Sequence, residues 1–123
     1  MEINDISGGV VDGSIKVHTY LGPGLLESAY QACLPYELQK RGFAVQTQVE
    51  LPIVYGDIKI DVGYRVDLVV EGLLLVEIKA VSRIQLIHEA QLLSYLKLGG
   101  FRAGLLINFH VPRLKDGIKR MVN

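Results

Sequence analysis

One stretch constrains the fold more than any other: residues 73–79, which read Leu-Leu-Leu-Val-Glu-Ile-Lys. A short apolar run of this kind predicts a strand that is buried on both faces. Glu77 and Lys79 stand at its end, although an unpaired charge is costly to bury. Residues two apart in a strand project to the same side, so both charged groups point toward one place. Buried charges are usually paired or bound to a metal, so this strand end predicts a functional site.

Apolar periodicity and breaker residues predict helices on both sides of a group of strands. Pro35 falls inside the second predicted helix, where a kink or an early end is expected because proline removes a hydrogen bond. The basic tail, residues 112–123, predicts a short helix. The expected elements are helices over 3–20, 24–40 and 85–98, and strands over 43–51, 53–55, 58–60, 64–70, 73–79 and 101–109. The apolar stripes are expected at Leu26, Ala29, Tyr30 and Cys33 in the second helix and at Leu86, Ala90, Leu93 and Leu98 in the third.

This order predicts an α/β fold with a mixed central sheet flanked by helices. Short loops make the first strands antiparallel, and the helical crossover makes the last strand parallel to its neighbour. A chain of 123 residues with 50% hydrophobic content suits one domain over 1–123 and argues against disorder. The single cysteine, Cys33, excludes an internal disulfide and is expected to be a buried filler.

Charge and hydropathy exclude some functions and leave others open. No apolar run approaches the ~20 residues of a membrane span, and the first residues do not resemble a signal peptide, so we expect a cytoplasmic protein without membrane contact. The net charge of zero argues against nonspecific coating of nucleic acid. Residues 1–78 carry 5 basic and 11 acidic side chains, whereas residues 79–123 carry 8 and 2. That asymmetry indicates either scattered solvated charges or a basic surface that faces a phosphate backbone.

Asp67 is the acid most able to join Glu77, because it also lies inside an apolar strand. If the two residues are directly opposite on neighbouring strands, their Cβ atoms lie about 5 Å apart. A two-residue turn at Glu71-Gly72 would instead pair Asp67 with Val76 and place Glu77 on the other face. The site therefore requires an odd loop or a β-bulge that pairs residue 67 with residue 77.

Two carboxylates in an apolar environment repel each other, and a hard divalent cation relieves the repulsion. Mg²⁺ or Mn²⁺ takes oxygen ligands, keeps several waters and leaves room for a substrate phosphate. Lys79, on the same side as Glu77, could orient an attacking water. The alternative is a buried cluster of Asp67, Glu77 and Lys79 that is held by salt bridges and has no chemistry. A similar triplet, Asp57-Ile58-Lys59, lies in an expected hairpin turn and indicates only surface charge.

Several motifs together resemble the GxxExxY protein family, which is grouped with the PD-(D/E)xK nuclease superfamily and in particular with RecB-like domains. The segment Gly24-Leu25-Leu26-Glu27-Ser28-Ala29-Tyr30 matches the signature G-x-x-E-x-x-Y. The other similar segments are Tyr64-Arg65-Val66-Asp67, Glu77-Ile78-Lys79, residues 88–95 (His-Glu-Ala-Gln-Leu-Leu-Ser-Tyr) and Leu106-Ile107-Asn108-Phe109. Val66 stands where the superfamily motif has proline, a departure that many members share.

The resemblance implies a restriction-endonuclease-like αβββαβ core with an extra N-terminal helix. It also implies a Mg²⁺ site at Asp67, Glu77 and the carbonyl of Ile78, with Lys79 as the motif lysine. Glu27 would be an acid from the first core helix that reaches the metal directly or through water, although it also reads as a solvated helix residue.

The helix residue Gln91 resembles part of the RecB-type Q-x-x-x-Y motif, placed to hold the lysine or a substrate phosphate. Tyr95 completes that motif and is a weaker candidate for substrate contact, as are Tyr30 and His88. The two tyrosines also suit core positions with satisfied hydroxyl groups, and His88 suits the surface.

These observations lead to the hypothesis of a Mg²⁺-dependent nuclease that hydrolyses phosphodiester bonds in DNA or RNA. The alternative is a non-catalytic module that binds nucleic acid or protein and retains the nuclease fold. A core of this size has little surface beyond the site, so a homodimer or a partner protein is expected to help hold the substrate.

Overall fold

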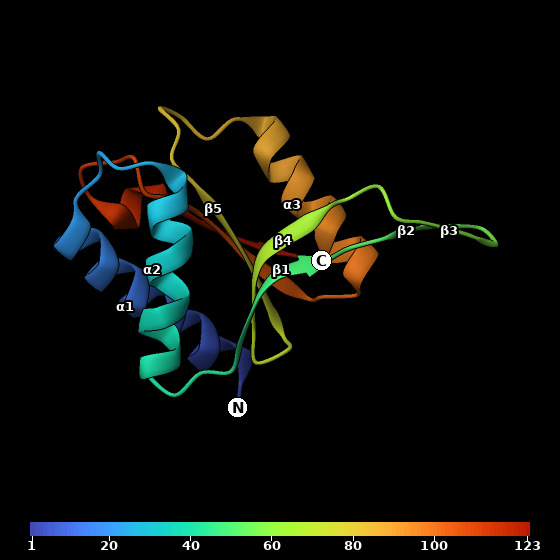
Figure 1. Cartoon of the computed structure of the whole chain (residues 1–123), viewed down its shortest axis with the longest axis horizontal. Helices are drawn as coiled ribbons and strands as arrows, with labels where there is room; N and C mark the ends of the chain where they lie inside the picture. The colour runs from blue at the N-terminus through green and yellow to red at the C-terminus, as the bar shows by residue number, and fades with distance from the viewer.

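The computed structural model describes residues 1–123 and places a five-stranded mixed sheet between helices (Figure 1). The sheet order is β1-β4-β5-β6-β7, in which only the β5–β6 pair is parallel. The helices are α1 (Ile3–Leu21), α2 (Glu27–Lys40) and α3 (Leu86–Gly99), with a 3₁₀ turn, η1 (Leu114–Gly117). The strands are β1 (Val45–Glu50), β2 (Ile53–Tyr55), β3 (Ile58–Ile60), β4 (Arg65–Val70), β5 (Leu74–Lys79), β6 (Ala103–Asn108) and β7 (Ile118–Val122). The predicted α/β fold is confirmed.

Strand β5 is buried on both faces, as its apolar run predicts. Leu74, Val76 and Ile78 belong to the core under α1 and α2, whereas Leu75 belongs to the core under α3. Figure 1 shows α1 and α2 on one side of the sheet and α3 on the other. Since side chains alternate along a strand, Glu77 shares the side of Leu75, which faces α3.

Two of the glycines of α1, Gly9 and Gly13, allow this helix to lie close to its neighbours. A Cβ atom at Gly9 would collide with the ring of Phe43, and one at Gly13 would lie 2.8 Å from Cδ2 of Leu38. Glycine weakens a helix by roughly 1 kcal/mol relative to alanine. The close packing of α1 against Phe43 and α2 explains why glycine is nevertheless found at these two positions.

The structure corrects several expectations about α2. The helix begins at Glu27 rather than at residue 24, and it continues without interruption through Pro35, so the predicted early end is wrong. Its buried stripe is Tyr30, Leu34 and Leu38, while Leu26 is 79% exposed. Tyr30 is thus confirmed as part of the stripe, whereas Leu26 precedes the helix and Leu34 and Leu38 extend the stripe beyond the predicted residues.

Helix α3 is also rotated relative to its predicted stripe. Its buried residues are Leu92, Tyr95 and Leu96, whereas Leu86 is 82% exposed. The helix is capped by Gln85, which forms a capping box with His88. The apolar residues of its first turn therefore lie outside the core.

The expected basic helix at the C-terminus is wrong. The tail forms η1 and then β7, which pairs antiparallel with β6 from Ala103–Val122 to Ile107–Ile118. An uncovered β6 would present unpaired backbone groups, and β7 satisfies them. None of the three helices combines the length and the apolar character that a membrane span requires.

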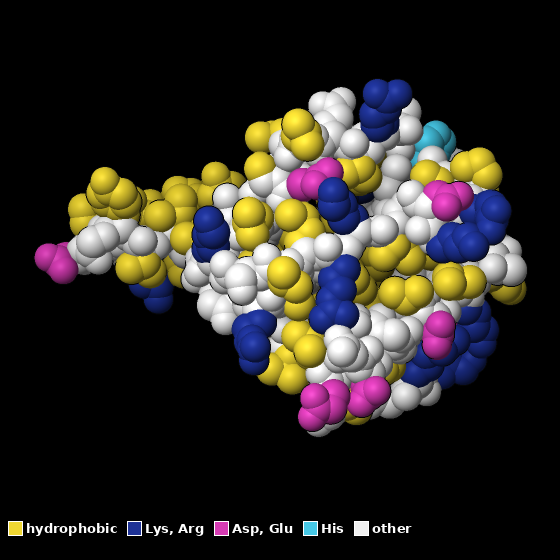
Figure 2. All heavy atoms as spheres, turned by 180° about the vertical axis from the view of Figure 1, so that it is seen from behind, with side chains coloured by type: hydrophobic (Ala, Val, Ile, Leu, Met, Phe, Trp, Pro, Cys, Tyr) yellow, Lys and Arg dark blue, Asp and Glu magenta, His cyan; other side chains and the backbone are white.

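Strands β2 and β3 form a separate hairpin that projects from the end of the sheet (Figure 1). We call residues 53–60 the arm. Figure 2 shows mainly apolar side chains along it and an acidic side chain at its tip. Val54, Tyr55 and Ile58 are all more than half exposed. The hairpin register over 53–60 is as the sequence predicts.

Candidate active site

The loop between β4 and β5 sets the register of the two predicted site strands. Val70 pairs with Leu74 and Leu68 pairs with Val76, so three residues, 71–73, form the loop. The same register places Asp67 opposite Glu77, one position beyond the last pair. The odd loop that the site required is thus confirmed. Glu71 and Gly72 both have positive φ values, 55° and 66°, which lets the chain turn this tightly.

Asp67 and Glu77 are fixed by reciprocal hydrogen bonds to each other's strand. The backbone N–H of Asp67 donates to Oε1 of Glu77 at 3.1 Å. The backbone N–H of Ile78 donates to Oδ2 of Asp67 at 2.8 Å. These side-chain bonds replace the strand ladder beyond Val76, so the two carboxylates are held beside each other.

Burial makes both carboxylates hard to ionise. Asp67 is 9% exposed and Glu77 is 6% exposed. Burial, together with the nearby charge of Asp67, raises the pKa of Glu77 to about 8, against a weaker opposing effect of Lys79. Burial also raises the pKa of Asp67, although hydrogen bonds from Ile78, Gln48 and Gln31 oppose the shift. The positive charge near Asp67 and Glu77 is therefore too small to neutralise both carboxylates.

Lys79 and Gln91 meet on the α3 side of β5. Nζ of Lys79 donates to Oε1 of Gln91 at 3.5 Å, and both side chains are half-buried. Tyr95 lies one turn along α3 from Gln91 and is buried. It is close enough to Glu77 for the two side chains to interact electrostatically. Burial and then the charge of Glu77 raise the pKa of the Tyr95 hydroxyl. The helix motif and the strand motif are thus adjacent in space.

Glu27 reaches the same strand end from the first turn of α2. Its Oε2 accepts a hydrogen bond from the backbone N–H of Ala80 at 3.3 Å. Its Oε1 accepts one from Nε2 of Gln31 at 3.2 Å, and the same Nε2 donates to Oδ1 of Asp67 at 3.1 Å. Gln31 therefore links the acid of α2 to the acid of β4.

Two glutamines that contact the acids of this site, Gln31 and Gln48, were not predicted from the sequence. Gln31 lies four residues after Glu27, so helical spacing gave a usable signal for it. Gln48 of β1 places its Nε2 3.4 Å from Oδ1 of Asp67. Its backbone has a φ of 51°, which is uncommon for a residue other than glycine and is costly inside a strand. No sequence pattern indicated that distortion.

Carboxylate oxygens are suitable ligands for a hard cation, but the acids of this site do not form a complete set of metal ligands. Nowhere do three or more His, Cys, Asp or Glu side chains lie together as a metal site. Gln31 lies between Glu27 and Asp67, so this arrangement does not place Glu27 for direct ligation. Asp67 and Glu77 supply paired oxygen donors with raised pKa values. The Ile78 carbonyl adds an oxygen beyond the last β4–β5 pair.

The two remaining candidates for substrate contact, Tyr30 and His88, have different surroundings. Tyr30 is fully buried and stacks on Phe109 with ring centroids 4.4 Å apart. Its hydroxyl donates to the carbonyl of Gly22 and accepts from the N–H of Leu25. Tyr30 therefore holds the turn before α2, as the alternative of a core tyrosine with a satisfied hydroxyl group predicts. His88 is half-buried, and its Nδ1 accepts a hydrogen bond from the N–H of Gln85.

A groove of about 510 Å³ adjoins the site, and we call it the α3 groove. It is lined by Ile53, Tyr64, Lys79, Ile87, His88, Gln91, Ser94, Tyr95 and Leu98. Lys79 and Gln91 thus belong both to the groove and to the neighbourhood of Glu77. The buried acids themselves do not line it.

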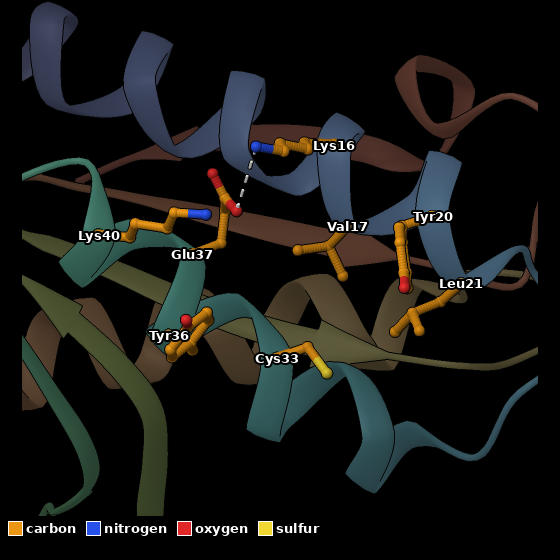
Figure 3. Close-up of a pocket in the computed structure, with 8 residues that line it drawn as sticks. All are labelled: Lys16, Val17, Tyr20, Leu21, Cys33, Tyr36, Glu37 and Lys40. Atoms are coloured by element: carbon orange, nitrogen blue, oxygen red, sulfur yellow. Dashed lines mark ion pairs between the residues drawn. The ribbon is translucent and has the colours of Figure 1, made fainter.

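A second hollow, of about 390 Å³, lies between α1 and α2 (Figure 3). Its polar edge is an ion pair in which Nζ of Lys16 lies 3.8 Å from Glu37. A hydrogen bond from Arg41 holds the pKa of Glu37 below its usual value. Cys33, which is half-buried rather than fully buried, faces this hollow. None of the predicted site residues lines it.

The sequence of the chain matches the model of a known protein family. A family model described as the PD-(D/E)XK nuclease superfamily matches residues 4–121. No curated protein and no solved structure matches the chain. The three helices and the five-stranded mixed sheet are consistent with the restriction-endonuclease-like fold of that superfamily.

Proposed function

The chain belongs to the PD-(D/E)XK nuclease superfamily, and we propose that it is a Mg²⁺- or Mn²⁺-dependent nuclease that hydrolyses phosphodiester bonds in DNA or RNA. We further propose that residues 1–123 form one nuclease domain of the GxxExxY type that acts in the cytoplasm. The catalytic residues would be Asp67, Glu77, Lys79, Gln91 and Glu27.

One observation carries the proposal: the reciprocal hydrogen bonds of Asp67 and Glu77 across β4 and β5. A structural salt-bridge cluster would match each buried carboxylate with a cation. Here the pKa of both acids is raised, and Lys79 donates its hydrogen bond to Gln91 instead. Two buried carboxylates that remain under-neutralised favour a site built to receive a cation.

The residues that would hold the cation are Asp67, Glu77 and the carbonyl of Ile78, with Glu27 acting through a water. When bound, the ion supplies neutralisation of the phosphate charge and lowers the pKa of a bound water. The hydrogen bonds from the backbone N–H groups of Asp67 and Ile78 orient the carboxylates beforehand. That preorganisation saves the entropy of fixing both side chains.

Lys79 would orient the attacking water and stabilise the negative charge that develops on the phosphate. Its ammonium is held by the side-chain carbonyl of Gln91, which restricts a flexible four-carbon chain to one direction. Gln91 therefore positions the lysine without needing to exchange a proton. Gln31 donates to Glu27 and Asp67, which gives these acids hydrogen-bond donors when no cation is near.

Calorimetric titration with Mn²⁺ and Mg²⁺ tests the proposal directly. Wild-type protein is expected to bind the ion and to cleave at least one of four labelled substrates: single- or double-stranded DNA or RNA. Asp67→Asn removes one carboxylate while preserving shape, and it is expected to lose both activities. Asp57→Asn, in the exposed arm, is the matched control and is expected to retain both.

Absence of metal binding and of cleavage in the wild type would overturn the nuclease proposal and favour the non-catalytic module. Cleavage that persists in Asp67→Asn would place the active centre elsewhere. Sedimentation of the same samples checks for a homodimer, which we propose as one way to enlarge the contact surface.

A further inference from the structure

We propose that the α3 groove binds an unpaired nucleobase stacked on Tyr64, so that the substrate is a single strand or an unpaired end. This inference rests on the proposed function and names the substrate class of the same site.

Three parts of the chain form the groove around Lys79. One wall is a single face of α3, since its lining residues 87, 91, 94 and 98 follow helical spacing. Ile53, at the start of the arm, and Tyr64, directly before β4, also line it. A volume of about 510 Å³ falls within the range of small-molecule sites, ~300–1,000 Å³.

The lining suits a flat and largely apolar ring that is attached to a phosphate. It contains no acidic side chain, and its only basic side chains are Lys79 and His88. Tyr64 is 41% exposed and Ile87 is 68% exposed, so both present apolar surface to the solvent. A ring stacked there would be joined to a phosphate next to Lys79.

Tyr64 is held firmly enough to act as a stacking platform. Its ring contacts that of Tyr95 with centroids 5.7 Å apart and planes tilted by 53°. Its carbonyl accepts hydrogen bonds from the N–H of Leu51 at 3.1 Å and from Arg65 at 3.0 Å. Tyr64 also lies only three residues before Asp67, so its backbone is tied to the site strand.

A base can occupy this groove only when it has left its stack. In a duplex both faces of each base are covered by neighbours, whereas an unpaired base can lie on an aromatic ring. The apolar lining would also accept a side chain of another protein. Continuity with Lys79 and the absence of acids favour a nucleotide.

Fluorescence anisotropy in EDTA, which prevents metal-dependent cleavage, tests this inference. The probes are a thymidine oligonucleotide of about 12 residues, within the ~4–16 nucleotides common for single-strand sites, an abasic strand of the same length, and a duplex. The base-bearing single strand is expected to bind about tenfold more tightly than the abasic strand, as stacking of one base suggests. Tyr64→Ala is expected to remove that difference, and Tyr64→Phe is expected to keep it.

The matched control is Tyr55→Ala, because Tyr55 is an exposed tyrosine of the arm that lies outside the groove. It is expected to bind all probes as wild type does. Ile87→Ala, at an exposed helix position, provides a second groove variant if Tyr64→Ala does not fold, and it is expected to lower the preference for bases about threefold. That smaller loss reflects apolar contact without aromatic stacking.

Equal binding of abasic and base-bearing strands would overturn the inference, as would equal binding of the duplex or absence of binding to any probe. The proposed function is judged separately by cleavage. Metal-dependent cleavage without base-dependent binding would retain the nuclease and reject the groove. Base-dependent binding without cleavage of any substrate would retain the groove and reject the nuclease.

Discussion

An acid-Ile-Lys triplet occurs twice in this chain, and the two copies have different environments. Asp57-Ile58-Lys59 lies at the tip of the arm, where all three residues are exposed and the two charged side chains join no ion pair. Glu77-Ile78-Lys79 ends β5, where Glu77 and Ile78 are buried. The spacing of the charges is the same in both.

The difference shows that the surroundings of Glu77-Ile78-Lys79, rather than the spacing of its charges, make this triplet a candidate for chemistry. Water screens Asp57 and Lys59, so their charges cost little. Glu77 has lost most of its water and lies opposite Asp67, so its pKa rises to about 8. The central residue differs as well: the N–H of Ile78 donates to the side chain of Asp67, whereas Ile58 pairs with Tyr55 in the ladder of the arm.

The largest effect is expected when the lysines of the two triplets are compared. Lys79→Ala should lower the cleavage rate by about 10²–10⁴-fold, the usual contribution of a side chain that acts on the attacking group. Lys59→Ala should leave the rate within about twofold, as is typical of surface substitutions. Single-turnover cleavage under saturating Mg²⁺ measures both.

Metal binding by Lys79→Ala should stay near the wild-type value, because the lysine is not a ligand. Equal losses of activity in the two lysine variants would mean that the environment of β5 does not distinguish the triplets.

The same comparison indicates what the sequence could predict. The apolar run of β5 and the acids at its end were visible because burial on both faces requires such a run. The pairing of residues 67 and 77 could be stated as a condition, and the three-residue loop meets it. The family resemblance added Glu27 and Gln91, which periodicity alone would not connect to this strand.

Other features depended on tertiary contacts that no local pattern records. The positive φ of Gln48 arises within an edge strand whose sequence alternates regularly. The tail became β7 because β6 offered an unpaired edge, which outweighed the composition of the tail. Leu26 and Leu86 were wrongly predicted to be buried, because residues near a helix start can be apolar without entering the core.

A second prediction compares the acids of the two triplets through the pH dependence of stability. A carboxyl whose pKa is raised on folding, from 4.5 to about 8 for Glu77, lowers the free energy of unfolding as the pH rises through that interval. Metal-free wild type should therefore lose stability between pH 5 and pH 8. Glu77→Gln should lose less and be more stable at pH 8 by roughly 2–4 kcal/mol, as the size of the shift suggests.

Urea unfolding at the two pH values, in EDTA, measures this difference. Asp57→Asn is the control and should retain the pH dependence of the wild type, because Asp57 is exposed. Parallel behaviour of Glu77→Gln and wild type would show that Glu77 ionises normally in the folded protein.

A third prediction concerns the pH dependence of Mg²⁺ binding. Metal ligands must be deprotonated, so the ion competes with the proton that Glu77 retains up to about pH 8. The apparent affinity should rise from pH 6 to pH 8, by at most about tenfold per pH unit, and then level off. Calorimetry in two buffers with different ionisation enthalpies should also detect release of a proton on binding. An affinity that is independent of pH would exclude Glu77 as a ligand.

The smallest predicted effect concerns Gln31, which joins Glu27 to Asp67 when no cation is present. Gln31→Ala should lower the free energy of unfolding by about 1 kcal/mol in EDTA, the usual value of a lost hydrogen bond. Saturating Mg²⁺ should reduce that cost, because the ion supplies positive charge to the same carboxylates. Gln39→Ala, at an exposed position of the same helix, controls for the change in helix propensity. If Mg²⁺ leaves the cost of Gln31→Ala unchanged, Gln31 stabilises α2 independently of the ion, and the acids of α2 and β4 do not share one site.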